Sequence, residues 1–198
     1  MVMSVLFMFQ CISNLINPLA QQIDRATRTR TVPAELVEAC APYLSAFNEQ
    51  LGSQQSDLVK LLRWPNEGDA AYARQRIAEA PDQSWSLYAI TWLPGQYTPI
   101  HDHGTWGVVT VLQGRLFEHQ MARLDEGGDD GIDLVPAGVC VLTPGAINSF
   151  IPEPDHIHYT GVPHGFAPTV SIHLYGRLMT SYHAYDLKTR SRYQMEVE

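Results

Sequence analysis

The sequence predicts a mainly β fold in which α-helices at the N-terminal end pack against a β-barrel or β-sandwich. Apolar residues recur at helical spacing in the first third of the chain, and short β-branched and aromatic runs separated by Gly and Pro follow from Ser84. The 198 residues, 45% of them hydrophobic, suffice for one domain with a substantial core, and no Gly- or Ser-rich linker divides them. We therefore expect a single domain over residues 1–198, with a helical part over 1–80 and a barrel with C-terminal strands over 84–198.

The predicted helices follow from the spacing of the apolar residues. Between residues 10 and 27, one helical face collects Ile12, Leu15, Ile16, Leu19 and Ile23. A second helix is expected to begin near Pro33, because proline favours the first helical position. Two shorter helices are predicted over 56–62 and 69–80. The apolar start at residues 5–9 is interpreted as the front of the first helix, since it lacks the basic segment and cleavage site of a secretion signal; a secretion remnant or an extended start is the alternative.

The predicted strands are short β-branched and aromatic runs at residues 85–92, 107–112, 138–142 and 169–175. Turn signals that contain Gly and Pro lie between them. Many short strands at this spacing are typical of a sandwich or barrel, in which strand edges are paired or covered. The acidic stretch from Asp125 to Asp133 is expected to be a solvated loop between two strands.

The composition argues against several classes of function. The chain has 13 basic and 21 acidic residues and a net charge of -8, so it lacks the basic surface of a nucleic-acid-binding protein. No apolar run reaches the roughly 20 residues that a membrane-spanning helix needs. Cys11, Cys40 and Cys140 show no tight spacing, which predicts reduced, buried thiols and hence a cytoplasmic protein without a disulfide framework.

The histidines give the first indication of chemistry. All eight lie in the second half of the chain. His101 and His103 are separated by one residue, and alternation along a strand would put both on one face, about 7 Å apart along the backbone. Such a pair can share a metal ion, although two polar residues on a surface strand would give the same pattern.

The glycines around this histidine pair form a second pattern. Gly95 precedes the pair by five intervening residues and Gly114 follows it, while Gly138 and Gly145 lie farther on, ahead of another histidine. The chain from about residue 84 to 193 thereby resembles a cupin. The resemblance implies a double-stranded β-helix, or jelly-roll, barrel with the N-terminal α-helices packed against it.

The pattern departs from many cupins at one point. Those proteins carry a glutamate four or five residues after the histidine pair, where this chain has Gly107 and Val108, neither of which can bind a metal. A third ligand must come from elsewhere and is expected to be another histidine, with His156 and His158 as the candidates. Three neutral imidazoles leave a divalent ion with its full charge, so the site would attract thiolates and carboxylates.

A closer resemblance chooses between these two histidines. His158 lies thirteen residues before Ser171, which begins a Ser-x-His-x-Tyr element with His173 and Tyr175. Together with the histidine pair, this arrangement resembles the thiol dioxygenases, the group of cysteine dioxygenase and bacterial 3-mercaptopropionate dioxygenase. The resemblance implies that His158, rather than His156, is the third iron ligand. The Ser-x-His-x-Tyr residues would share one strand face beside the metal as a hydrogen-bonded relay; the alternative is a polar stripe in the barrel interior.

The same resemblance predicts the substrate site. Tyr72 and Arg74 lie upstream of the histidine pair as the Tyr-x-Arg element of the family does, within the segment expected to be helical. In cysteine dioxygenases the arginine pairs with the substrate carboxylate, whereas the mercaptopropionate enzymes typically have glutamine there, so Arg74 favours cysteine. The alternative is a surface arginine such as Arg76, and a shift of one residue would bring Gln75 into the site.

Further positions point in both directions. Gly176 and the Trp106-Gly107 pair resemble the mercaptopropionate enzymes, while residues 183–186 resemble a His-Ala-Phe-Asp stretch of cysteine dioxygenases. Gly107 or Val108 stands where the animal enzymes carry the cysteine that cross-links to the tyrosine. No Cys–Tyr cross-link is therefore expected, and Tyr175 should remain a free phenol. Three histidines without a partner pattern are interpreted as structural or surface residues: His119, His164 and His183.

The resemblance to the thiol dioxygenases implies a cytoplasmic oxidoreductase that binds one Fe(II) per chain. The type of ligand alone would also allow nickel, manganese, copper or zinc, because imidazole binds each of them. The resemblance implies that both atoms of O2 are added to the sulfur of a small thiol, L-cysteine giving cysteine sulfinate, with 3-mercaptopropionate as the alternative substrate. Small thiol and O2 are the expected partners of a monomer or small homo-oligomer. The histidine pair is also compatible with another metal-dependent cupin, such as an isomerase or a carbon–carbon-cleaving dioxygenase, and the fold with a non-catalytic ligand-binding cupin. The expected site residues are His101, His103 and His158 for the metal, Arg74 and Tyr72 for the substrate, and Tyr175, His173 and Ser171 for catalysis.

Overall fold

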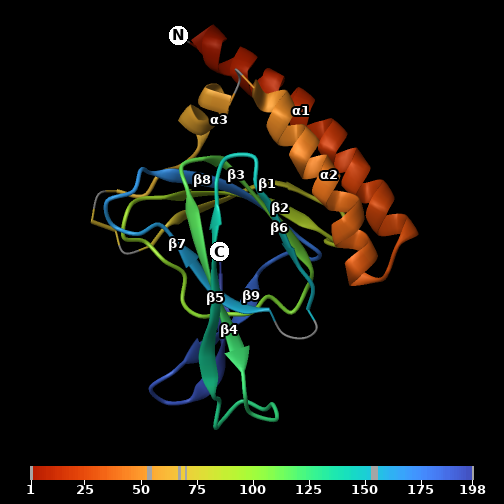
Figure 1. The fold of residues 1–198 in the computed structure, drawn as a ribbon. Coiled ribbons are helices and arrows are strands. Elements are labelled where there is room, and N and C mark those ends of the chain that lie inside the picture. Colours follow the sequence, from red (N-terminus) through yellow and green to blue (C-terminus); the bar gives the residue numbers. More distant parts are fainter. Residues whose placement is uncertain (1, 53–54, 67, 70, 153–155, 198) are drawn as a thin grey trace.

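The computed structural model describes residues 2–52, 55–66, 68–69, 71–152 and 156–197, with side chains from residue 13 onward (Figure 1). The helices of this part of the chain are α1 (Val2–Thr29), α2 (Pro33–Leu51) and α3 (Gln55–Leu61). Its first five strands are β1 (Ala73–Glu79), β2 (Ser86–Trp92), β3 (Gly107–Gln113), β4 (Leu116–Arg123) and β5 (Leu134–Leu142). The remaining strands are β6 (Ile147–Phe150), β7 (Ile157–Gly161), β8 (Thr169–Tyr175), β9 (Ser181–Asp186) and β10 (Ser191–Glu196).

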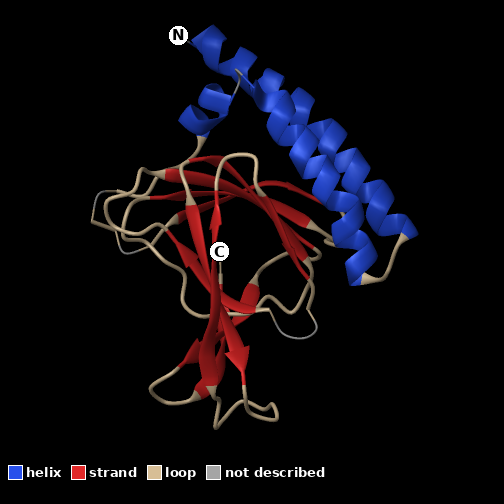
Figure 2. Cartoon of the chain, in the orientation of Figure 1, coloured by secondary structure: helices blue, strands red, loops and turns tan. Residues whose placement is uncertain are grey.

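The strands form a jelly-roll barrel from antiparallel sheets. One sheet has the order β1-β2-β8-β3-β6, a second has the order β5-β4-β7, and β9 and β10 form a hairpin. A cavity lined by residues of β2, β3 and β8 on one side and of β4 and β7 on the other lies between the two larger sheets. Figure 2 shows the strands closing around this interior, with the helices outside it. The predicted mainly β jelly roll with N-terminal helices is confirmed.

The helices cover the outer face of the five-stranded sheet. Residues of α2 such as Leu44 and Phe47 belong to the same buried apolar cluster as Ile172 and Leu174 of β8. Because side chains alternate along a strand, the next residues of β8 face the opposite way, into the barrel. All seven residues of β8 are buried, since the helices cover one face and the barrel interior encloses the other.

The segment predicted as a fourth helix is a strand. Residues 69–80 contain β1, which pairs antiparallel with β2 and continues the five-stranded sheet. Its Ala, Arg, Gln and Glu residues favour a helix locally, but pairing with β2 and packing of Ile77 against the apolar cluster outweigh that preference. The helical part of the described chain therefore ends at Leu61 rather than at residue 80.

Other boundaries agree with the sequence or extend it. The first helix is longer than residues 10–27 and continues through Pro18, α2 begins at Pro33 as predicted, and β5 begins before residue 138. The acidic stretch lies between β4 and β5, as predicted. Among the described side chains, Cys40 and Cys140 are free thiols, and the side chain of Cys11 lies outside the described part.

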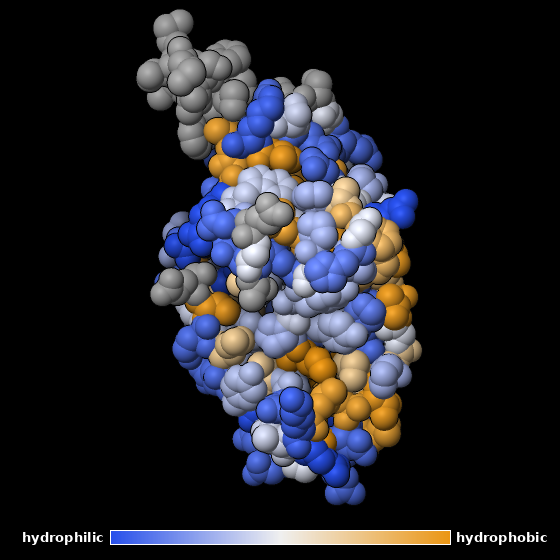
Figure 3. Space-filling model, turned by 90° about the vertical axis from the view of Figure 1, so that its left-hand side faces the viewer, coloured by the Kyte–Doolittle hydropathy of each residue, from blue (hydrophilic) through white to orange (hydrophobic). Residues whose placement is uncertain are grey.

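The surface is mostly polar on the face shown in Figure 3, where apolar side chains gather in smaller groups. Several of the exposed apolar residues belong to β5 at the edge of its sheet, namely Val135, Val139 and Val141. Among the described helices, none combines the length and the hydropathy needed to cross a bilayer.

We predict that the helices and the barrel unfold together. Leu44 is 0% exposed at the centre of the shared cluster, so Leu44→Ala should lower the free energy of unfolding by about 2–5 kcal/mol. Urea denaturation followed by tryptophan fluorescence and by circular dichroism measures this change, with the exposed Glu49→Ala on the same helix as the control. Separate transitions for the two probes would show instead that the helices form an independent unit.

Candidate metal centre

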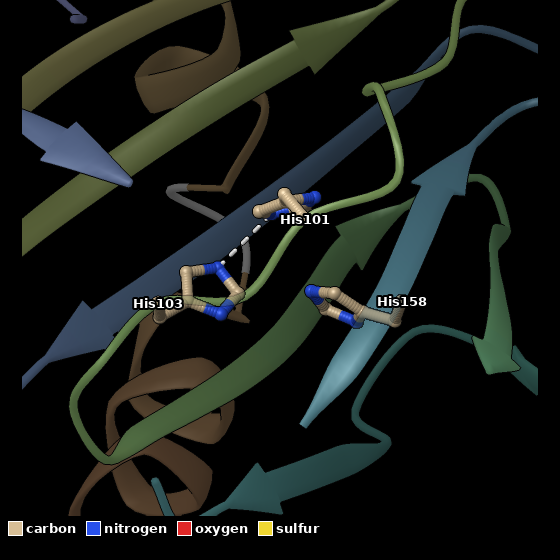
Figure 4. Close-up of side chains that lie close together, drawn as sticks. All are labelled: His101, His103 and His158. Atoms are coloured by element: carbon tan, nitrogen blue, oxygen red, sulfur yellow. Dashed lines mark hydrogen bonds between the residues drawn. The ribbon is translucent and has the colours of Figure 1, made fainter. Parts of the chain in front are cut away.

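Three histidines converge inside the barrel (Figure 4). The Nε2 atoms of His101 and His103 lie 3.2 Å apart, and one ligand nitrogen from each of these residues and from His158 lies within 4.8 Å of the others. His101 and His103 precede β3, and His158 lies on β7. Backbone hydrogen bonds join the two segments: His101 N donates to His158 O over 2.8 Å, and His158 N donates to His101 O over 2.9 Å.

The sequence predicted that the histidine pair lies on a strand. In the structure the pair lies on a loop. His101 forms isolated bridges to His158 and to Ala184, so the loop is paired on both sides. Between the two histidines, the buried Asp102 accepts a hydrogen bond from Tyr185 Oη over 2.6 Å. Contacts with β7 and β9, rather than strand alternation, therefore bring the two rings together.

The protonation states of the three rings suit a metal ion. Burial, together with the neighbouring histidines, holds the pKa of His101 and of His103 well below the usual value, and burial also lowers the pKa of His158. Each ring is therefore neutral near pH 7 and carries a lone pair that a metal can accept. His101 uses Nδ1 to donate to Pro99 O over 2.9 Å, which leaves its Nε2 unprotonated.

The positions of the histidine nitrogens fit a metal ion in two respects. His158 Nε2 is buried and has no hydrogen-bond partner among the described residues, which is costly unless an ion or water satisfies it. A 3.2 Å separation between two imidazole nitrogens is also what two ligands adopt on one ion with bonds of about 2.0–2.1 Å. The three-histidine cluster could therefore hold a divalent transition metal.

A buried glutamate lies behind the cluster, and the sequence analysis missed it. Glu118 of β4 places Oε1 3.2 Å from His156 Nε2 and Oε2 3.6 Å from His158 Nδ1. Burial alone would raise the pKa of Glu118, but the hydrogen bonds from His156 and His158 hold it well below its ordinary range. The carboxylate is ionised, and with the two histidines it forms a second group of potential metal ligands. Its position two residues after Leu116 was the one available sequence signal, and this stretch was not among the predicted strands.

His156 lies closer to the site than predicted. The resemblance placed His156 outside the metal set, but its Nε2 lies 3.2 Å from His158 Nδ1, on the side of the His158 ring away from Nε2. Its ring also stacks on Phe150, a further wall of the cavity that the sequence analysis missed. His156 therefore contacts a ligand of the three-histidine cluster without belonging to it.

The Ser-x-His-x-Tyr residues of β8 share the face that points into the barrel. Ser171 Oγ lies 2.8 Å from His173 Nε2, and His173 Nδ1 lies 3.2 Å from Tyr175 Oη. The Tyr175 ring lies beside His103, with the centroids 5.0 Å apart. The row of hydrogen bonds thus leads to the histidine cluster.

Trp92 gives this row a direction. Its indole N–H can only donate, and it donates to Ser171 Oγ over 2.9 Å. Ser171 can then donate to His173 Nε2, and His173 Nδ1–H to Tyr175 Oη, which frees the phenol hydrogen of Tyr175 for a ligand in the cavity. Burial lowers the pKa of His173 to about 3 and raises that of Tyr175, so both stay neutral as this chain of donors requires. Trp92 was recognised from sequence only as part of a strand.

Arg74 and Tyr72 line the same cavity as the histidines. Arg74 reaches it from β1 and not from a helix; its Nη2 donates to Met179 O over 2.8 Å, and its guanidinium carbon lies 3.7 Å from the centroid of the Tyr88 ring. Gln75 is directed elsewhere, because its Oε1 accepts a hydrogen bond from Arg63 N. The residue that faces the cavity is therefore Arg74.

The space between these groups is small. Its volume is about 40 Å³, roughly three times the 10–15 Å³ that one water molecule needs. Arg74 contributes a cation to the lining, and most other lining residues are aromatic or aliphatic. The cavity suits a ligand of few non-hydrogen atoms with an anionic group.

Other residues named from the sequence lie outside the described cavity lining. Trp106 belongs to the apolar cluster under the helices. Gly107, and not Val108, pairs with Tyr175, and the Phe150 ring fills the space where a side chain at Gly107 would be. The three histidines interpreted as structural also lie elsewhere: His119 stacks on Tyr159, His164 packs on Gly95, and His183 contacts Asp102.

We predict that metal binding distinguishes the two groups of potential ligands. His103→Ala and His158→Ala should lose the ion because each removes a nitrogen of the three-histidine cluster, whereas His156→Ala should retain it. The measurement is the metal content of each reconstituted variant by mass spectrometry, with His119→Ala as a control outside the cavity. Retention by His103→Ala combined with loss by His156→Ala would place the ion at Glu118 instead.

No family model matches the chain. Among solved structures, a cupin-like protein from Thermotoga maritima is 16% identical, with a TM-score of 0.42, over 60% of this chain and 81% of its own. A protein with a double-stranded β-helix domain from Klebsiella pneumoniae is 21% identical, with a TM-score of 0.43, over 61% of this chain and 81% of its own. An oxalate oxidase in complex with glycolate is 19% identical, with a TM-score of 0.43, over 60% of this chain and 57% of its own. By its own sheet order and topology, the chain has a double-stranded β-helix, or jelly-roll, barrel, and a buried histidine cluster that could hold a metal lies inside it.

Proposed function

We propose that this protein is an Fe(II)-dependent thiol dioxygenase that converts a small carboxylate thiol to its sulfinate, with L-cysteine as the first candidate substrate. The observation that carries the proposal is the row from Trp92 through Ser171 and His173 to Tyr175, which ends beside the histidine cluster. A cluster that only bound a metal would not need such a row. A buried phenol held in one orientation is suited to position a reacting ligand.

The proposed reaction balances without a further reductant. Both atoms of one dioxygen molecule are transferred to the thiol sulfur, and the thiol proton stays with the sulfinic acid or leaves to water. The four-electron oxidation of sulfur matches the four-electron reduction of dioxygen. Iron(II) held by His101, His103 and His158 would supply the redox chemistry that dioxygen requires.

Tyr175 would act as a hydrogen-bond donor at the reacting atoms. Burial raises its pKa, so the phenol keeps its proton near pH 7. His173 donates to its oxygen in the direction set by Trp92, and the phenol hydrogen is then available to a substrate or oxygen atom next to His103. Because the groups are already oriented, no reorganisation is needed when the ligand enters.

Arg74 would bind the carboxylate of the substrate. Its guanidinium is planar and always charged, and the contacts with Met179 O and the Tyr88 ring hold it at the cavity wall. Fixing the carboxylate there aims the sulfur of a short thiol at the histidine cluster. Tyr72, which packs on Trp92, narrows the same end of the cavity.

3-Mercaptopropionate is the second candidate substrate, and the charge of the lining supports it. Among the described lining residues, Glu118 is the single acidic one, and side chains already surround its carboxylate. The ammonium group of cysteine therefore has no protein carboxylate available to it. A thiol that has the carboxylate but lacks the ammonium avoids this cost.

The proposal predicts dioxygen consumption coupled to sulfinate formation. The Fe(II)-loaded chain should consume one O2 per sulfinate formed from L-cysteine or 3-mercaptopropionate, and should be much less active with cysteamine, which lacks the carboxylate. An oxygen electrode and product quantification by mass spectrometry measure the two quantities. Absence of coupled uptake with all three thiols, in protein shown to hold iron, would exclude the thiol dioxygenase.

Arg74→Ala tests how the substrate is bound. Loss of a charge-assisted pair should weaken carboxylate binding by about 1.5–3 kcal/mol, seen as a higher KM for a carboxylate thiol. Arg76→Ala is the matched control, because Arg76 lies two residues away on the same strand, is exposed and contacts Glu79. Equal KM values for wild type and Arg74→Ala would remove Arg74 from the substrate site.

A further inference from the structure

Glu118 is an ionised group in the barrel that the proposed reaction does not use. Its side chain is 1% exposed. Glu118 lies two residues after Leu116 on β4, so both side chains face the interior of the barrel. In the pairing of β4 with β7, Glu118 lies opposite Thr160, and Gln120 lies opposite His158. Strand register therefore carries the carboxylate to the back of the His158 ring.

The carboxylate is held firmly in place. Asn148 Nδ2 donates to Oε2 over 2.8 Å, and Gln120 Nε2 donates to Oε1 over 3.3 Å. His156 Nε2 lies 3.2 Å from Oε1, and His158 Nδ1 lies 3.6 Å from Oε2. Two amide hydrogen bonds and two imidazole nitrogens thus surround one carboxylate, and these contacts compensate for burying its charge.

The three histidines of the cluster differ in what lies behind them. His101 donates from Nδ1 to a backbone carbonyl, and His103 Nδ1 has no hydrogen-bond partner among the described residues. Of the three, His158 alone has a carboxylate near its outer nitrogen, with Glu118 Oε2 at 3.6 Å from Nδ1. His156 Nε2 lies closer to the same nitrogen, at 3.2 Å, and also contacts the carboxylate. A carboxylate in that position fixes the tautomer and orientation of a ligand imidazole and raises its basicity.

We propose that Glu118 is a positioning residue of the metal centre, which holds His158 with Nε2 directed at the ion and offsets part of the positive charge of a divalent cation. This role rests on the metal-binding part of the proposed function. The glutamate that many cupins place in the metal set has no equivalent after the histidine pair, at Gly107 and Val108. In this chain the negative charge lies one residue removed from the ion, behind a histidine, and all three ligands can remain neutral imidazoles.

Cobalt(II) binding to the full chain, in the absence of any thiol, tests the role separately from catalysis. Affinity and stoichiometry are measured by competition with a chromophoric chelator for wild type, E118Q, E118D and the control Thr160→Val. E118Q keeps the shape but removes the charge, and should weaken cobalt binding about 10- to 100-fold while the unfolding midpoint of the metal-free chain stays close to that of wild type. E118D, which keeps the charge, should recover part of the affinity, and Thr160→Val, a buried change opposite Glu118, should leave it unchanged.

Two results of the titration would overturn the role of Glu118 without affecting the metal centre. The first is an equal cobalt affinity of wild type and E118Q. The second is two cobalt ions per wild-type chain, of which E118Q loses one, since Glu118 would then be a ligand itself. A wild-type chain that binds no cobalt would overturn the metal centre as well. If E118Q does not fold, paramagnetic NMR of the cobalt-loaded wild type decides. A slowly exchanging, shifted Nδ1–H of His158 supports the role, and a rapidly exchanging one contradicts it.

Discussion

Two reciprocal backbone hydrogen bonds between His101 and His158 are the constraint on which the rest of the site depends. They join the loop before β3 to strand β7. They thereby bring the three-stranded sheet β5-β4-β7 and the helix-covered five-stranded sheet together at one point. The side chains at this junction have little freedom, because Asp102 fixes the loop from the other side through Tyr185. A cluster of histidines results from main-chain pairing, before any metal contributes to it.

The helices make this polar interior possible although they supply none of its described lining residues. By covering the outer face of β8 they allow one strand to carry an apolar row toward α2 and a polar row toward the cavity. The enclosed space has a low dielectric constant, which keeps the imidazoles neutral and strengthens each hydrogen bond in the Trp92 to Tyr175 row. The same burial makes an unpartnered charge costly, and this explains why Glu118 is surrounded by donors.

The parts that could be predicted from sequence are those that depend on local periodicity. Strand β8 matches residues 169–175, and alternation alone places Ser171, His173 and Tyr175 on one face. The prediction of a helix over residues 69–80 was wrong, because pairing of β1 with β2 outweighs a local helical preference. The prediction that His101 and His103 lie close together was correct, but not because of strand alternation. The two residues lie on a loop that pairs with His158 and Ala184. Glu118 was missed because its role depends on the register of β4 against β7, which no local pattern encodes.

Anomalous diffraction at the iron edge, from crystals of the Fe(II)-loaded chain, would show which residues bind the ion. We expect one anomalous peak per chain, bonded to one nitrogen each of His101, His103 and His158, with Glu118 behind His158 and not bonded to the ion. A peak between Glu118, His156 and His158, or no ordered iron in the barrel, would contradict this expectation.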